Sequence, residues 1–112
     1  MNHALGLRTV SELSVHAAAV TDGGTIGSAW TPTFSGALRL SCCFSVAAAL
    51  KVTISDGSNT QEVLFNEGNS LGAGVLYNDS LAVRQGFTYT FSVVGAAATV
   101  HFTGQFVTGG VL

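Results

Sequence analysis

Apolar and polar residues alternate along several stretches of the chain, and this period of two constrains the fold more than any other feature. Residues 87–93 show it best: every second position is Phe, Tyr or Val, and the positions between them are Thr or Ser. Successive side chains of a β-strand point to opposite faces, so the pattern predicts a strand with one buried face. The same alternation recurs in residues 38–46, 50–54 and 100–106.

Turn residues separate these stretches and predict how they connect. The linker Gly95-Ala96-Ala97 is short, so we expect an antiparallel hairpin between residues 87–93 and 100–106, with Gly104 as a candidate bulge. Asp56-Gly57-Ser58-Asn59 is a strong turn signal, because Asp and Gly tolerate the positive φ of a tight turn. The strand expected after it, residues 60–65, alternates weakly, which would suit a strand covered on both faces.

The number and spacing of the expected strands indicate the fold class. Weaker candidates are residues 75–77 and 81–84, which flank a turn at 78–80, and a long β-compatible segment at 7–20. Seven or eight short strands with turn signals about every 8 to 12 residues are typical of a sandwich or small barrel. We predict an all-β, antiparallel, jelly-roll-like sandwich. It would be a single domain over residues 1–112, with extended arms at 1–6 and 108–112.

Charged residues are scarce, and this excludes several classes of partner. Four Lys or Arg and six Asp or Glu make up 9% of the 112 residues, whereas soluble domains carry about 25%. Nucleic-acid binding needs clustered cations, but Arg8, Arg39, Lys51 and Arg84 are scattered along an acidic chain. The longest uncharged apolar stretch, residues 40–50, is well short of the roughly 20 residues of a membrane helix. We expect no nucleic-acid partner and no membrane partner.

The start of the chain and the cysteines suggest where the protein folds. The first eight residues lack the basic and apolar segments of a secretory signal, so we expect no secretion. Cys42 and Cys43 are adjacent and would point to opposite faces of a strand, so they cannot easily bridge each other. One core thiol and one half-exposed thiol, formed in a reducing compartment, is the simplest interpretation.

No arrangement of residues along the sequence predicts catalysis. There is no nucleophile elbow and no paired carboxylate motif, and the Gly-rich segment 68–74 lacks the Lys-Ser/Thr ending of a phosphate loop. His3, His16 and His101 are far apart in the sequence and have no metal-ligand spacing. We therefore predict no enzyme, no catalytic residue, no cofactor and no metal ligand.

Aromatic residues leave one ligand-binding alternative open. Tyr89 shares the face of Phe87 and Phe91 and so is expected in the core, whereas Trp30 precedes Pro32 in a loop or strand end. An exposed Trp30 with nearby loops could form a carbohydrate platform, as in many small β-sandwich modules. A saturable change in Trp fluorescence with a glycan, abolished by Trp30→Ala, would favour this alternative.

The scarcity of charge also predicts self-association. Edge strands of sheets are usually protected by charged side chains, and here Thr, Ser and Ala occupy the positions that alternation assigns to solvent. The centres of protein interfaces are depleted in charge in the same way. We expect a homo-oligomer. The predicted contact residues lie in the arms and in the Trp30 loop, and they are Leu5, Leu7, Trp30, Val111 and Leu112.

Two segments resemble known structural proteins. Leu71-Gly72-Ala73-Gly74-Val75-Leu76-Tyr77 and residues 83–91, with the pattern V-x-x-G-x-TY-x-F, are similar to the C-terminal part of small structural proteins of tailed bacteriophages. The likeness covers about a third of the chain, and the first 60 residues match nothing comparable. It implies a virion role such as capsid decoration, fibre or adaptor subunit, assembled in the host cytoplasm, often as a trimer with other virion proteins as partners. No functional residue of this chain can be assigned from the resemblance.

Overall fold

A computed structural model describes residues 8–108, and the side chains of residues 13–107. Seven strands account for most of this part of the chain, together with one 3₁₀ turn, η1, at Asn66–Gly68. The strands are β1 (Arg8–Val20), β2 (Gly36–Phe44), β3 (Ala49–Ser55), β4 (Thr60–Leu64), β5 (Tyr77–Val83), β6 (Thr88–Val94) and β7 (Ala98–Thr108).

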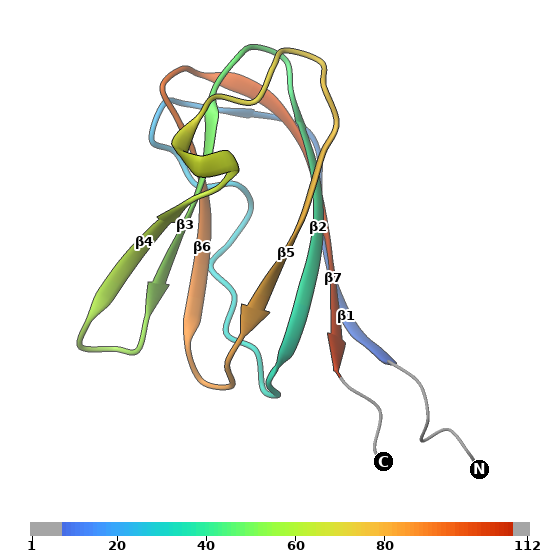
Figure 1. Cartoon of the computed structure of the whole chain (residues 1–112), viewed down its shortest axis with the longest axis vertical. Coiled ribbons are helices and arrows are strands. Elements are labelled where there is room, and N and C mark those ends of the chain that lie inside the picture. Colours follow the sequence, from blue (N-terminus) through green and yellow to red (C-terminus); the bar gives the residue numbers. More distant parts are fainter. Residues whose placement is uncertain (1–7, 109–112) are drawn as a thin grey trace.

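The strands form two antiparallel sheets that face each other (Figure 1). The four-stranded sheet has the order β1-β7-β2-β5, and the three-stranded sheet has the order β4-β3-β6. Residues 23–30 run along the free edge of β6 as an irregular eighth strand. The N–H groups of Gly23, Ile26 and Trp30 donate to β6 carbonyls at 2.7–2.9 Å. With this segment included, the chain passes between the sheets in the manner of a jelly roll, so the predicted fold class is confirmed.

Alternation explains both why the strands form and which face of each is buried. Along β2, Leu38, Leu40, Cys42 and Phe44 are at most 2% exposed, while the residues between them face outward. Their partners from β7 and from the three-stranded sheet fill the space between the layers. The fully buried residues there include Leu50, Val52, Tyr89, Val93, Val100 and Phe102. The predicted core position of Tyr89 is confirmed, and its hydroxyl accepts a hydrogen bond from the Arg84 N–H at 2.7 Å.

One predicted hairpin is confirmed and another is wrong. β3 and β4 pair as expected, and the Asp56 carboxylate accepts hydrogen bonds from the N–H groups of Ser58 and Asn59 at 2.8 and 2.7 Å. These bonds lower the pKa of Asp56. By contrast, β6 and β7 are consecutive strands that lie in different sheets. Gly95 and its neighbours therefore form a crossover between layers, because β7 pairs with strands from the first half of the chain.

Three local expectations are also corrected. Residues 78–80 form no turn, because β5 runs unbroken through them beside β2. Strand β4 is an exposed sheet edge and is not covered on both faces. Gly104 is no bulge: it pairs in register with Leu13 and Leu40 and points inward, where a Cβ atom would lie 3.0 Å from Cδ1 of Leu38. Glycine keeps the period of two there while leaving room for the leucine.

The predicted arms, residues 1–6 and 108–112, lie outside the described residues except for Thr108, which ends β7. Within residues 8–108, no helix has the length and apolar character needed to cross a membrane.

Candidate interaction surface

The outer face of the four-stranded sheet is a regular surface that carries polar side chains. The register of the strands places its residues in cross-strand rows, and β7 and β2 contribute to each row. In the row of Gln105, the β1 position in register is Glu12. We define the outer face by three such rows: Ser14, Thr103, Ser41 and Asn78; Gln105, Arg39 and Ser80; His16, His101 and Cys43. All of these side chains are exposed or half-exposed.

Charge is sparse on this face. Within its three rows Arg39 is the only charged residue with a described side chain, and Asp79 of β5 lines the groove that crosses the face. The acidic residues Asp22 and Asp56 lie in turns, where Asp22 accepts a hydrogen bond from the Gly95 N–H at 2.8 Å. On the three-stranded sheet, Lys51 and Glu62 form an ion pair at 3.2 Å. Apart from Arg39 and Asp79, the charged side chains that the structure describes lie in loops and turns or on the three-stranded sheet, away from the outer face.

An open groove of about 820 Å³ runs across the outer face. Its floor comprises the row that contains Thr103 and the row that contains Arg39. The hydroxyl of Ser41 donates to the side-chain oxygen of Asn78 within this groove. Such short, uncharged side chains can bury against another surface at a small desolvation cost when their hydrogen bonds are met.

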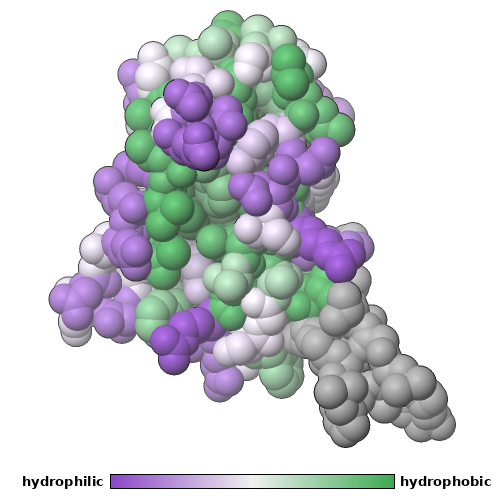
Figure 2. Space-filling view, viewed as in Figure 1, coloured by the Kyte–Doolittle hydropathy of each residue, from purple (hydrophilic) through white to green (hydrophobic). Residues whose placement is uncertain are grey.

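One end of the sandwich exposes apolar side chains. The loop that follows β2 carries Val46, and the loop that precedes β5 carries Val75 and Leu76, which are 40%, 56% and 63% exposed. The Ala48–Leu71 bridge and a hydrogen bond from the Gly74 N–H to the Phe44 carbonyl hold the two loops together. Figure 2 shows this apolar surface at the uppermost end of the molecule.

Of the predicted contact residues, the structure describes only Trp30. Leu5, Leu7, Val111 and Leu112 lie outside the described residues, so their role stays a prediction. Trp30 is half-buried, and its ring packs edge-on against Phe106 with 5.1 Å between the ring centroids and tilted against Tyr89 at 5.8 Å. It lines an apolar cleft of about 290 Å³ between β1 and the irregular eighth strand. A ring held against interior aromatics offers less free surface for stacking a sugar.

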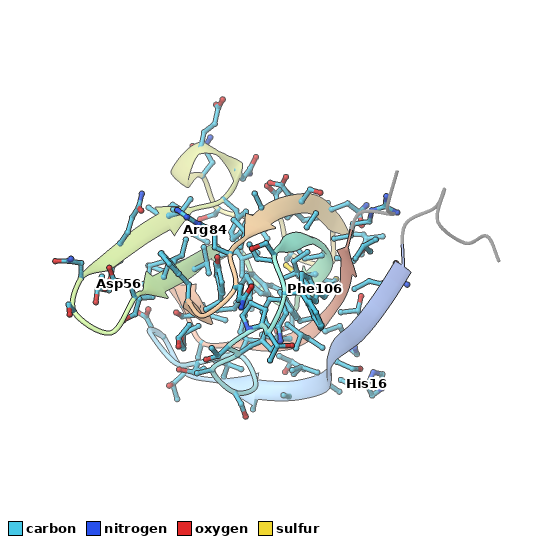
Figure 3. All side chains as sticks on the ribbon, turned by 90° about the horizontal axis from the view of Figure 1, so that it is seen from below. His16, Asp56, Arg84 and Phe106 are labelled. Carbon is cyan, nitrogen blue, oxygen red and sulfur yellow. The ribbon has the colours of Figure 1, made fainter. Side chains whose placement is uncertain are left out.

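Two histidines that are distant in the sequence meet on the outer face, a contact that their spacing along the chain does not predict. Nδ1 of His16 lies 3.2 Å from Nδ1 of His101, and the ring centroids are 4.6 Å apart. Figure 3 shows His16 outside the ribbon of β1, whereas Phe106 points into the sandwich. The pair joins residues 85 positions apart, and spacing along the chain gives no signal for it.

The remaining polar cluster lies at the margin of β5. The Tyr77 hydroxyl donates to the Asp79 carboxylate at 2.6 Å and accepts from the Asn66 N–H at 3.1 Å. Partial burial, and then the neighbouring Asp79, raise the pKa of Tyr77 to about 12. Tyr77 connects β5 to η1 and so has a structural role.

Both cysteines are free, and burial raises the pKa of the inward-facing Cys42 thiol to about 12.

No family model, no curated protein and no solved structure matches the chain. The resemblance of residues 71–77 and 83–91 to phage structural proteins therefore stays a prediction, and function is inferred from the fold and the surface.

Proposed function

We propose that the chain is a non-enzymatic assembly subunit whose copies associate through the outer face of the four-stranded sheet. The observation that supports this most directly is the composition of that face, whose described side chains include only two charged ones, Arg39 in its rows and Asp79 at its groove. Interface centres are depleted in charge because each buried ion must lose its water. A mean hydropathy of +0.47 and a net charge of −2 favour the same conclusion, since weakly charged surfaces associate.

The free edge of β1 adds a second means of contact. This strand is 13 residues long and lies at the margin of its sheet, next to the outer face. Long edge strands present unpaired N–H and C=O groups that can pair with another chain. Each subunit of a closed ring contacts two neighbours. The outer face and the edge of β1 would provide these two contact surfaces on one chain.

Within this class we propose a virion component of a tailed phage, such as a capsid decoration, fibre or adaptor subunit, assembled in the host cytoplasm. The resemblance in residues 71–77 and 83–91 supports it, and jelly rolls are common in viral capsid domains. A homo-trimer or another closed homo-oligomer, bound to other virion proteins, fits this role. The exposed apolar end at Val46, Val75 and Leu76 is available for such a partner.

The substitution Thr103→Lys tests the proposed interface. Thr103 is exposed on the central strand β7 of the outer face, between Ser14 and Ser41. Burying its ammonium group would cost about 3 kcal/mol or more, which raises the dissociation constant of the oligomer roughly 100-fold. Sedimentation velocity across a dilution series measures this shift.

Thr53→Lys is the matched control, because Thr53 occupies the outer surface of the other sheet on its central strand β3, opposite Glu62. It should leave the oligomer unchanged. Dissociation caused by Thr53→Lys, or an unchanged oligomer with Thr103→Lys, would contradict the assignment of the interface to the four-stranded sheet.

A further inference from the structure

The pairing of β1 with β7 contains an irregularity that brings His16 to His101. Val15 pairs with Phe102 and Ala18 pairs with Val100, so two residues of β1 lie opposite the single residue His101. This is a β-bulge, a device that changes the direction in which a side chain points. Ala17, the second of these two residues, has φ of +51°, a conformation that L-residues other than Asn and Asp seldom adopt. The bulge lets His16 share the outer face with His101.

The separation of the two ring nitrogens suits two ligands of one metal ion. Zinc–imidazole bonds are about 2.0–2.1 Å long, so two nitrogens at a tetrahedral angle lie about 3.3 Å apart. In the structure Nδ1 of His16 and Nδ1 of His101 are 3.2 Å apart. Both rings are exposed, so small rotations can turn both nitrogens toward one ion without moving the backbone. We propose that His16 and His101 form a two-histidine chelate for a divalent transition metal ion such as Zn²⁺.

The chemistry of the ligands selects the class of ion. Imidazole favours zinc and neighbouring transition metals over Ca²⁺ and Mg²⁺, which prefer oxygen ligands. Among the residues described, no group of three or more His, Cys, Asp or Glu is placed to hold a metal ion. The described residues thus supply two ligands, and water or a neighbouring copy that covers the outer face completes the coordination. Cys43 pairs with His101 in register, yet it is not one of the two ligands.

Binding requires no redox step. In the metal-free pair one Nδ1 donates its proton to the other, which accepts it. When the ion binds, it releases two of its water ligands and forms two coordinate bonds to the Nδ1 lone pairs. The proton that was shared leaves to solvent and another returns to Nε2 of the same ring, so two neutral rings remain neutral and no proton is released overall.

Zinc titration of the purified protein in its native assembly tests the site, with a chromogenic chelator as competitor. One Zn²⁺ should bind per chain. His16→Ala and His101→Ala should each weaken binding by more than about tenfold, since even residues that only support a ligand contribute about 10–100-fold. His3→Ala is the matched control, because it removes the remaining histidine of the chain, and it should leave the affinity unchanged.

Two further measurements separate ligation from folding. Nitrogen-15 NMR should show the Nδ1 resonances of both rings moving when Zn²⁺ is added, with Nε2 protonated in both rings of the bound state. Cys43→Ser should retain wild-type affinity. The proposal is overturned by the absence of saturable zinc binding, by binding that survives in both histidine variants, or by a loss of binding in Cys43→Ser. It does not depend on the oligomer, so failure of the proposed interface leaves it standing.

Discussion

Ala17→Gly should stabilise the protein, against the usual effect of placing glycine in a strand. Ala17 has φ of +51°, and an L-residue with this left-handed conformation loses about 1–2 kcal/mol relative to its preferred regions. Glycine adopts it freely, but the greater freedom of glycine in the unfolded chain costs about 0.5–1 kcal/mol. The free energy of unfolding should therefore rise by about 0.5–1 kcal/mol.

Urea denaturation measures this change, and Ala19→Gly is its matched control. Ala19 is likewise exposed on β1, two residues further along, and it pairs in register with Thr99. Here φ is negative, so glycine brings only the entropic cost and should lower the free energy of unfolding by about 0.5–1 kcal/mol. Equal destabilisation by both substitutions would show that Ala17 is not in the left-handed conformation, and that the bulge presenting His16 is absent.

Two further predictions rest on the shifted pKa values. In folded protein diluted until the oligomer dissociates, which uncovers the outer face, iodoacetamide should label Cys43 and spare Cys42, a residue that is 1% exposed and whose thiol has a pKa raised to about 12. Cys43→Ser should therefore abolish labelling of the folded protein, while Cys42→Ser retains it. Labelling of folded Cys43→Ser, detected by mass spectrometry, would contradict the burial of Cys42. Tyr77 should ionise near pH 12, because burial and Asp79 disfavour its anion. The tyrosine of the unfolded chain loses its proton at a lower pH, near 10.0, so the free energy of unfolding should fall between pH 10.0 and about 12. Tyr77→Phe should remove this part of the pH dependence, which denaturation curves recorded across the range would measure. The same pH dependence in Tyr77→Phe would refute the assignment.

Strand positions could be predicted from the sequence because burial in a two-layer sandwich imposes a period of two. Alternation in residues 38–46 and 87–93 identified β2 and β6 to within two residues, and the turn at Asp56 identified the β3–β4 hairpin. The fold class follows from the number of such strands. The irregular eighth strand at residues 23–30 carries no alternation, and it was found only through its hydrogen bonds to β6.

The pairing of strands could not be predicted in the same way. A short linker such as Gly95-Ala96-Ala97 is compatible with a hairpin and with a crossover between sheets. The crossover forms here because β7 pairs with β1 on one side and with β2 on the other, which leaves no edge of β7 for β6. Gly104 looks like an interruption in the sequence, although it is the inward residue that makes room for Leu38. The His16–His101 pair needs both the register of β1 with β7 and the bulge at Ala17, and neither leaves a local mark in the sequence.

The mass of the native assembly tests the central claim most directly. Native mass spectrometry or light scattering of the wild-type protein at micromolar concentration should give an integer multiple of the 11.4 kDa chain, with a trimer the expected species. A stable monomer of 11.4 kDa under these conditions would contradict the proposal that the sparsely charged outer face is covered by other copies of the chain.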